Sequence, residues 1–245
     1  MVIYKKKIMG NTGDNILSES GLWSFGGDTP SKFNKHVSKS VPLYKEGHDL
    51  ICGMAEFFVP QNGKVLHIGS STGILTNKVA KTLKKRDAQI IGLEIEPNMI
   101  KEAKLMDYET NIEYINDDIT TFDIGENCNN LIISYYTIQF IHPSMRQLVV
   151  EKIYKSLMWG GAFIMFEKVR GSDARFQDIF NSFYQDFKSK QGYSADEILE
   201  KQRSLKSILE PFSRQGNIDM LKRANFVDIE SILKYACFEG FLSIK

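Results

Sequence analysis

Short apolar segments alternate with longer amphipathic ones through the middle of the chain, and this alternation limits the possible folds more than any other feature. Segments that are rich in β-branched and aromatic residues and bounded by turn residues are typical of buried strands, and they lie at 64–68, 89–93, 112–115, 131–135 and 162–166. Helical patterns separate them at 72–85, 97–106 and 144–158. This order predicts an α/β fold with a parallel sheet covered by helices on both faces.

The pattern changes after Glu167. Two helical stretches follow at 173–190 and 194–210, a third spans about 217–224, and two apolar runs at 227–233 and 236–244 are spaced as an antiparallel pair. We therefore expect a seven-stranded, mostly parallel sheet. The extra helices, at about 172–212, would form a lid over the carboxyl ends of the strands, where such sheets bind ligands.

The remaining segments complete the predicted domain organisation. Residues 1–21 are polar and glycine-rich, which predicts a flexible lead-in without chemistry. Residues 22–61 predict a helical cap, and 62–245 predict the sheet domain with its lid. In 245 residues, 42% are hydrophobic and 25% are charged, which indicates a globular protein rather than a disordered one.

Charge and cysteine content exclude several classes of function. The net charge is only +1, without the basic footprint of a nucleic-acid-binding protein, so we expect a small-molecule substrate and no direct nucleic-acid partner. No apolar segment approaches the roughly 18 residues of a membrane span. Three widely spaced cysteines without a C-x-x-C pair indicate a reducing, cytoplasmic compartment: Cys52, Cys128 and Cys237.

Two further kinds of catalytic site are not indicated. The four histidines lack ligand spacing and no H-E-x-x-H motif occurs, so no metal site is expected. A serine nucleophile elbow is also missing.

A glycine-containing loop joins the first predicted strand to the helix after it. Gly69, Ser70 and Gly73 stand in a G-x-x-x-G arrangement, where glycine allows a tight turn and the helix N-terminus offers free N–H donors. The G-x-G-x-x-G pattern that brings a backbone against a pyrophosphate is missing, which disfavours a dinucleotide. Taken alone, the loop is also compatible with a plain strand-to-helix turn.

Two acidic positions follow the next two strands. Glu94 ends the second strand, where a carboxylate can accept hydrogen bonds from both ribose hydroxyls. Asp118 follows the third strand and can accept from an adenine amino group, with Ile95 and Ile119 on either side of the ring. An Asx turn is the alternative for Asp118. Together these positions favour an adenosyl ligand, with S-adenosylmethionine (SAM) preferred over NAD.

Several segments together resemble one family. They are Trp23-Ser24-Phe25, the run from His36 to Tyr44, Tyr136 to Ile141, Glu167-Lys168, Asp186-Phe187-Lys188, Gly192-Tyr193-Ser194 and Gln202-Arg203-Ser204. Over about residues 22–245 the chain resembles the carboxy-SAM synthases, bacterial enzymes that use SAM and prephenate to make carboxy-SAM for tRNA wobble-uridine modification. The resemblance implies a class I methyltransferase, Rossmann-like fold, SAM as cofactor, and a homodimer.

The resemblance also implies roles for particular residues. Tyr44 and Arg203 would bind the added carboxylate, for which an arginine offers a bidentate fork. Gly69 would lie under the methionine part, and Asp118 with Ile119 would hold the adenine. In the family chemistry, prephenate loses carbon dioxide and hydroxide to become phenylpyruvate, and the deprotonated sulfonium methyl captures the carbon dioxide. Without the resemblance, Arg203 is compatible with a solvated helix arginine.

The chain departs from the family pattern close to the reacting atoms. His67 replaces an acidic residue, Ser70 a cysteine, Glu94 an aspartate, Tyr135 an asparagine that contacts the cofactor, and Leu43 a glycine. His67 either hydrogen-bonds to backbone or changes how the SAM amino group is held. Tyr135 is expected to reshape the reactive end of the pocket.

These departures keep other functions open. Transfer of the ordinary methyl group to a small molecule needs mainly an aligned acceptor, and a SAM cyclase that releases methylthioadenosine is a second alternative. A catalytically silent SAM-binding module is the third. An aromatic wall could attract the sulfonium by cation–π interaction or could simply line the pocket, and its candidates are Tyr44, Tyr135, Tyr136 and Phe140.

Overall fold

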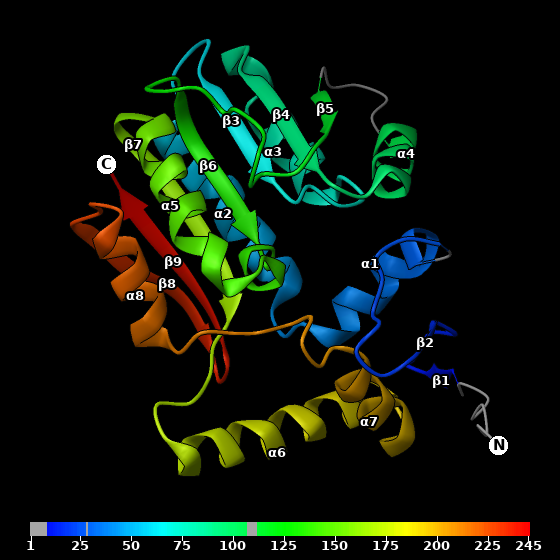
Figure 1. The fold of residues 1–245 in the computed structure, drawn as a ribbon. Coiled ribbons are helices and arrows are strands. Elements are labelled where there is room, and N and C mark those ends of the chain that lie inside the picture. Colours follow the sequence, from blue (N-terminus) through cyan, green and yellow to red (C-terminus); the bar gives the residue numbers. More distant parts are fainter. Residues whose placement is uncertain (1–8, 28, 107–111) are drawn as a thin grey trace, which may run out of the picture.

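The computed structural model describes residues 9–27, 29–106 and 112–245. Seven strands form one sheet in the order β5-β4-β3-β6-β7-β9-β8 (Figure 1). Their bounds are β3 (Lys64–Ile68), β4 (Gln89–Glu94), β5 (Ile112–Asn116), β6 (Asn129–Tyr135), β7 (Leu157–Lys168), β8 (Asp228–Tyr235) and β9 (Phe238–Ile244). Strands β3 to β7 are parallel, and β9 runs antiparallel to both β7 and β8. The predicted five parallel strands and terminal antiparallel pair are confirmed.

Helices cover both faces of this sheet. On one face, α2 (Tyr44–Phe58) and α3 (Ile74–Thr82) pack on Val65, Ile133 and Ile164. On the other, α5 (Pro143–Ser156) and α8 (Arg214–Arg223) pack on Leu66, Ile132 and Phe163. Since neighbouring strand residues point to opposite faces, these runs of consecutive apolar residues supply both cores.

The remaining helices and turns near the sheet differ little from the predicted ones. Helix α4 (Pro97–Met106) follows β4, and a short 3₁₀ helix η2 (Ile138–Phe140) follows β6. The helix predicted at 72–85 is shorter, because Gly73 adopts a φ of +78° before α3 begins and the chain continues as the 3₁₀ helix η1 (Lys84–Arg86).

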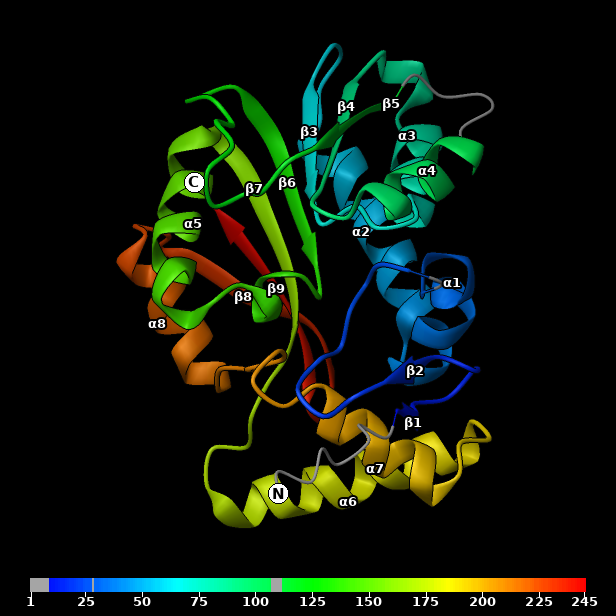
Figure 2. The ribbon, with the colours of Figure 1, turned by 45° about the vertical axis from the view of Figure 1, so that its right-hand side comes forward.

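A separate layer lies across the carboxyl ends of the strands. It contains α6 (Ala174–Lys190) and α7 (Ala195–Ser204), together with α1 (Thr29–Ser40) and a small hairpin of β1 (Gly10–Asn11) and β2 (Leu17–Ser18). Figure 2 shows β1 and β2 beside α7. Backbone N–H groups of Gly21 and Trp23 donate to the carbonyls of Arg203 and Ser204, at 2.9 and 3.1 Å. The lid layer is therefore built from the N-terminal segment and from the stretch between β7 and α8.

Part of the expected flexible lead-in has a defined structure. Residues 1–8 lie outside the described residues, but Thr12 and Ile16 are buried and Asp14 has only 5% of its side chain exposed. The polar, glycine-rich composition predicted a loop, whereas contacts with remote residues hold this segment in a hairpin. Among the described helices, none is long and apolar enough to cross a membrane.

Candidate active site

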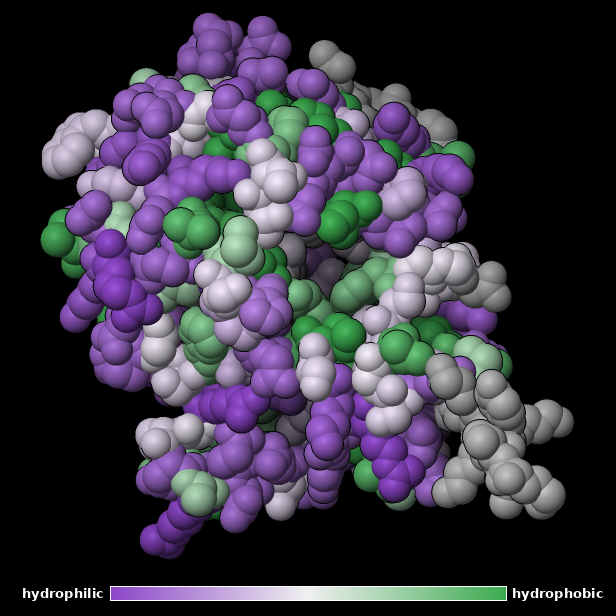
Figure 3. Space-filling model, in the orientation of Figure 1, coloured by the Kyte–Doolittle hydropathy of each residue, from purple (hydrophilic) through white to green (hydrophobic). Residues whose placement is uncertain are grey.

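One large cavity, of about 1120 Å³, lies between the carboxyl ends of the strands and the lid layer. In Figure 3 the surface is hollowed near the middle of this face, with hydrophobic residues around the hollow. Most predicted site residues line the cavity: Tyr44, His67, Gly69, Ser70, Glu94, Ile95, Asp118, Ile119, Tyr135 and Arg203. Gly73 is the predicted site residue that does not line it. The topology thus brings residues from remote segments to one site.

The glycine loop after β3 turns tightly at Gly69, which has a φ of +70°. The N–H groups of Gly69 and Ser70 both donate to the Leu93 carbonyl, at 2.8 and 3.1 Å, and a Cβ at position 69 would collide with the Thr137 side chain. Only glycine satisfies both constraints. Gly73 has a packing role instead, because a Cβ at this position would collide with Ala103 and Tyr114. It allows the close packing of α3 beside α4.

Glu94, which was predicted to bind a ribose, lies in the wall of the cavity. Its carboxylate is buried, and its two oxygens accept hydrogen bonds from the backbone N–H groups of Ser71 (2.8 Å) and Glu96 (2.9 Å). Burial raises its pKa, while these backbone donors act in the opposite direction. Each oxygen retains acceptor capacity, so the group can still receive two hydroxyls. Ile95 beside it has 64% of its surface exposed and is available to contact a ring.

Asp118 forms the predicted Asx turn and also lines the cavity. One carboxylate oxygen accepts from the Thr120 backbone N–H at 2.8 Å, which is the Asx-turn arrangement. The other oxygen has no hydrogen bond within the described residues and belongs to a cavity-lining side chain. Ile119 is 7% exposed and joins the core while lining the cavity. The turn therefore positions a carboxylate oxygen and an apolar surface together.

His67 is a buried, neutral histidine. Its Nδ1 lies 2.7 Å from the Thr76 hydroxyl, so its partner is a side chain and not the backbone. Burial, followed by the effect of nearby His48, lowers its pKa to about 3. Its Nε2 has no partner among the described residues. A neutral ring replaces the negative charge that the family pattern has at this position.

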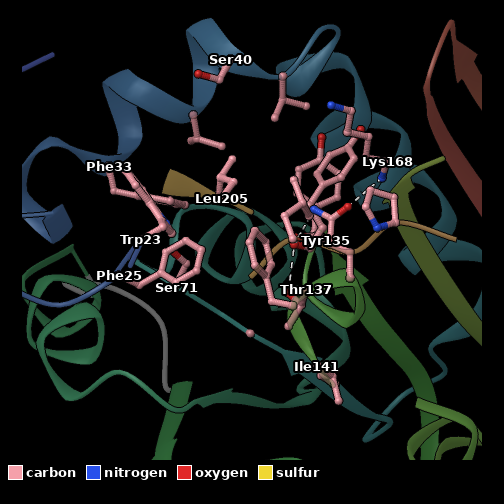
Figure 4. Close-up of a pocket in the computed structure, with 18 of the residues that line it drawn as sticks. Trp23, Phe25, Phe33, Ser40, Ser71, Tyr135, Thr137, Ile141, Lys168 and Leu205 are labelled. Carbon is pink, nitrogen blue, oxygen red and sulfur yellow. Dashed lines mark hydrogen bonds between the residues drawn. The ribbon is translucent and has the colours of Figure 1, made fainter. Parts of the chain in front are cut away.

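Tyr135 turns its hydroxyl away from solvent and ties β6 to α2. The hydroxyl donates to the Tyr44 carbonyl at 2.8 Å, and the ring lies 4.9 Å from His48 and 5.0 Å from Phe166. A Cβ at position 47 would collide with this hydroxyl, so Gly47 makes room for it. Figure 4 shows Tyr135 on the same side of the pocket as Lys168. The bulky phenol thus contributes to the wall of the pocket.

Tyr44 and Arg203 reach the cavity from opposite layers. The Tyr44 hydroxyl has no hydrogen bond in the described part of the chain, and burial raises its pKa, so it is a neutral donor. Arg203 is paired with Glu200, with 2.6 Å between Nη1 and Oε1, and its side chain is 55% exposed. To bind a ligand carboxylate, Arg203 would have to break its ion pair with Glu200.

A group of cavity-lining cations was not predicted from the sequence. Lys168 ends β7, Lys188 lies in α6 and Lys201 in α7. Lys168 and Lys188 belong to segments quoted above for the family resemblance, but a lysine on an amphipathic helix ordinarily indicates a solvated face. Only the packing of α6 and α7 shows that these side chains face inward.

Comparisons with known proteins agree with this geometry. Residues 65–161 match the methyltransferase domain family. A carboxy-S-adenosyl-L-methionine synthase from Staphylococcus epidermidis is 36% identical over 224 residues, covering 91% of this chain and 97% of that protein. One from Nautilia profundicola is 34% identical, covering 91% of this chain and 94% of that protein. The chain belongs to the carboxy-SAM synthase family.

Solved structures of other proteins support the same fold for this carboxy-SAM synthase family member. A putative O-methyltransferase from Nostoc punctiforme matches with a TM-score of 0.65 at 17% identity, covering 96% of this chain and 64% of that one. Human N-acetylserotonin methyltransferase in complex with SAM matches with a TM-score of 0.53 at 16% identity, covering 74% and 47%. The class I methyltransferase fold is confirmed, and the chain is a SAM-dependent transferase of this superfamily.

The residues present fit SAM. Glu94 offers acceptors for a ribose, and the Ser70 hydroxyl is buried without a partner in the described residues, beside the strand end where the methionine part would lie. Small-molecule pockets usually measure about 300–1,000 Å³. At about 1120 Å³, the cavity has room for SAM and a second small molecule.

Proposed function

We propose that this protein makes carboxy-SAM from SAM and prephenate. The observation that carries the proposal is that Tyr44 and Arg203, two donors suited to an added carboxylate, line the same cavity as Glu94 and Asp118. An ordinary neutral methyl group would need neither donor. The family membership over nearly the whole chain agrees with this assignment.

The proposed chemistry couples a decarboxylation to a carboxylation. Prephenate releases carbon dioxide and hydroxide as it becomes phenylpyruvate, hydroxide takes a proton from the sulfonium methyl of SAM to give water, and that carbon then forms a bond to carbon dioxide. The charges balance. Prephenate carries two negative charges and SAM one net positive charge, whereas carboxy-SAM is neutral and phenylpyruvate carries one negative charge.

The chain contributes binding and orientation. In the proposal, Glu94 accepts from the ribose hydroxyls and the free oxygen of Asp118 accepts from the adenine amino group, with Ile95 and Ile119 beside the ring. Tyr44 donates to the new carboxylate, and Arg203 leaves Glu200 to pair with it. Because a charged hydrogen bond contributes roughly 1.5–3 kcal/mol, loss of Arg203 should weaken carboxy-SAM binding by about 10- to 150-fold.

One observation favours an alternative reaction. Tyr135 replaces the family's asparagine, and its hydroxyl is used to bond the Tyr44 carbonyl rather than offered to the cavity. A pocket end walled by phenol rings suits a sulfonium cation, and such a wall would equally serve a small-molecule methyltransferase or an internal cyclisation of SAM.

Product analysis separates these functions. Purified protein is incubated with SAM, with and without prephenate, and every adenosyl product is identified by mass spectrometry. Carboxy-SAM formed only with prephenate is the expected result. Methylthioadenosine from SAM alone would establish cyclisation instead, and unchanged SAM in both mixtures would contradict carboxyl transfer.

A variant tests the role of Arg203. Arg203→Ala should lose most carboxy-SAM formation, whereas Arg175→Ala, which alters an exposed arginine of α6 outside the cavity lining, should not. Full yield from Arg203→Ala would show that its assigned role is wrong.

We also propose a cytoplasmic homodimer. The three cysteines are free thiols, which suits a reducing compartment. On α6, Phe176, Ile179 and Phe183 are each about half exposed (49%, 51% and 45%) and follow a helical spacing, so they present an apolar face that a second copy would cover. Light scattering after gel filtration should give twice the monomer mass, and Ile179→Glu should shift it towards the monomer.

A further inference from the structure

Charge is segregated along the cavity. The acidic lining residues lie at the carboxyl ends of β4 and β5, and they are Glu94, Asp117 and Asp118. Three lysines lie at the opposite end, on β7 and the lid helices: Lys168, Lys188 and Lys201. A fourth lysine of the lining, Lys206, is exposed and follows α7. The first end suits the hydroxyls and amino group of an adenosine. The second suits an anion.

These three lysines have no carboxylate partner in the part of the chain that the structure describes. Their ammonium groups lie over aromatic rings instead: Lys168 is 4.4 Å and Lys188 is 5.4 Å from the centre of the Tyr184 ring, and Lys201 lies over Trp23. By contrast, Arg170 and Arg203 beside the same cavity are paired with Glu210 and Glu200. These three lysines are thus inward-facing cations without a carboxylate partner among the described residues.

Because these lysines are largely buried, keeping their ammonium groups charged without a carboxylate partner costs free energy. Lys188 is 5% and Lys201 is 7% exposed, and a cation–π contact supplies only about 0.5–2 kcal/mol. Burial lowers the pKa of Lys188 to about 8, with a further contribution from the charge of Lys168, and Lys188 acts on Lys201 in the same way. Since these ammonium groups repel one another, an anion between them would stabilise all three.

We propose that Lys168, Lys188 and Lys201 bind a carboxylate of the second substrate, an organic dianion. This inference rests on the proposed function, in which that substrate is prephenate. The carboxylate that leaves as carbon dioxide becomes neutral, so cations bound to it would favour the ground state over the transition state. The lysines therefore hold the other carboxylate, the one that phenylpyruvate retains. Their task is to bind and orient the substrate.

Phenylpyruvate tests this site without catalysis, because it carries only the retained carboxylate. Calorimetric titration of phenylpyruvate into the full chain saturated with S-adenosylhomocysteine should show binding at least tenfold tighter than that of phenylacetone, in which a methyl group replaces the carboxylate. Lys188→Met and Lys201→Met should each weaken phenylpyruvate binding at least tenfold. Methionine keeps the length of the side chain, and removing an unpaired buried charge should not unfold the protein.

A lysine that does not line the cavity provides the control. Lys190→Met, which changes an exposed lysine of the same helix α6, should bind phenylpyruvate as the unchanged chain does. Affinity for S-adenosylhomocysteine should stay within twofold in every variant. Unchanged phenylpyruvate binding in Lys188→Met and Lys201→Met would overturn the inference, and so would an equal loss of S-adenosylhomocysteine binding.

The proposed function and this inference can fail independently. If the unchanged chain makes carboxy-SAM but the lysine variants keep their KM for prephenate, the function stands and the lysine site is wrong. If no carboxy-SAM forms but phenylpyruvate binding depends on the lysines, the function fails and the anion site stands.

Discussion

Leu43 shows how a single residue can carry strain in this fold. It precedes α2 with φ 54° and ψ 32°, a left-handed backbone that is unfavourable for a branched side chain, and the family pattern has glycine there. This left-handed conformation is needed because only three residues connect α1 to α2, and Tyr44 at the start of α2 lines the cavity. The strain is thus placed next to a site residue.

Replacing Leu43 by glycine should therefore cost the protein little stability. The left-handed conformation costs a non-glycine residue roughly 1–2 kcal/mol, and glycine loses roughly 0.5–1 kcal/mol in conformational entropy, so the backbone gain is up to about 1.5 kcal/mol. Leu43 is 37% exposed, so most of its side chain is buried and the lost burial offsets this gain. Urea unfolding measures the difference. A midpoint for Leu43→Gly as low as that for Leu50→Gly, within α2, would contradict it.

A second prediction concerns Glu94. Glu94→Gln keeps the size of the side chain but replaces one acceptor oxygen by an amide that cannot accept from a ribose hydroxyl. Loss of a charged hydrogen bond of roughly 1.5–3 kcal/mol should weaken SAM binding by about 10- to 150-fold, measured by calorimetry. Glu96→Gln is the matched control, because Glu96 accepts from the Asn98 backbone and does not line the cavity. Equal affinities would show that Glu94 does not bind SAM.

At the scale of elements, the lid is held by one buried carboxylate. Asp14, in the β1–β2 turn, accepts from the Tyr193 hydroxyl at 2.6 Å, lies 3.2 Å from His36 Nδ1, and accepts from Lys39 at 3.3 Å. Burial raises the Asp14 pKa, but these hydrogen bonds outweigh it and the pKa is lowered. One side chain thus joins the hairpin, α1 and the loop between α6 and α7.

Asp14→Asn should loosen this layer while leaving the sheet intact. Hydrogen bonds to a charged group contribute roughly 1.5–3 kcal/mol each, so we expect local destabilisation of about 2 kcal/mol. Hydrogen exchange should speed up in residues 10–20 and 193–204 but not in β3 or β6. Asp49→Asn, which breaks an exposed pair with Lys78, should have little effect. Uniform acceleration, or none, would contradict a local anchor.

The elements differ in how well the sequence predicts them. Strand β3 and helix α4 match their predicted bounds, because their apolar periodicity is local. The β1–β2 hairpin could not be predicted, since Asp14 finds Tyr193 only in the folded chain. Glu94 could be placed at the cavity from its position at a strand end, whereas the inward-facing side chain of Lys201 depends on how α7 packs.

At the scale of the whole molecule, buried histidines should make the protein sensitive to acid. Burial is the first cause that lowers the pKa of His36 to about 3, of His48 to about 4 and of His67 to about 3. Below about pH 6.5 the unfolded chain binds these protons and the folded chain does not, so stability falls as pH decreases towards 4. Asp14, whose pKa is lowered, acts in the same direction.

Glu167 acts in the opposite direction, and its effect begins at about pH 4.5. Burial raises its pKa to about 8, so the folded state holds a proton that the unfolded state releases above about pH 4.5, and stability falls as pH rises towards 8. Because three buried histidines oppose this one carboxyl group, urea midpoints should still drop between pH 6.5 and pH 4.5. His48→Gln should reduce this drop, and His142→Gln, at an exposed position, should not. Equal midpoints for the unchanged chain at both pH values would contradict the prediction.

The lid also bears on the order in which the chain folds during synthesis. Gly21 and Trp23 bond to the backbone of Arg203 and Ser204, about 180 residues later in the chain. Contacts of such separation are expected late in folding, because a long loop must close first. The segment around Gly21 and Trp23 thus waits for about 180 further residues to be synthesised before it has these partners. A nascent chain stalled before α7 would already hold β3 to β6 but no closed substrate cavity.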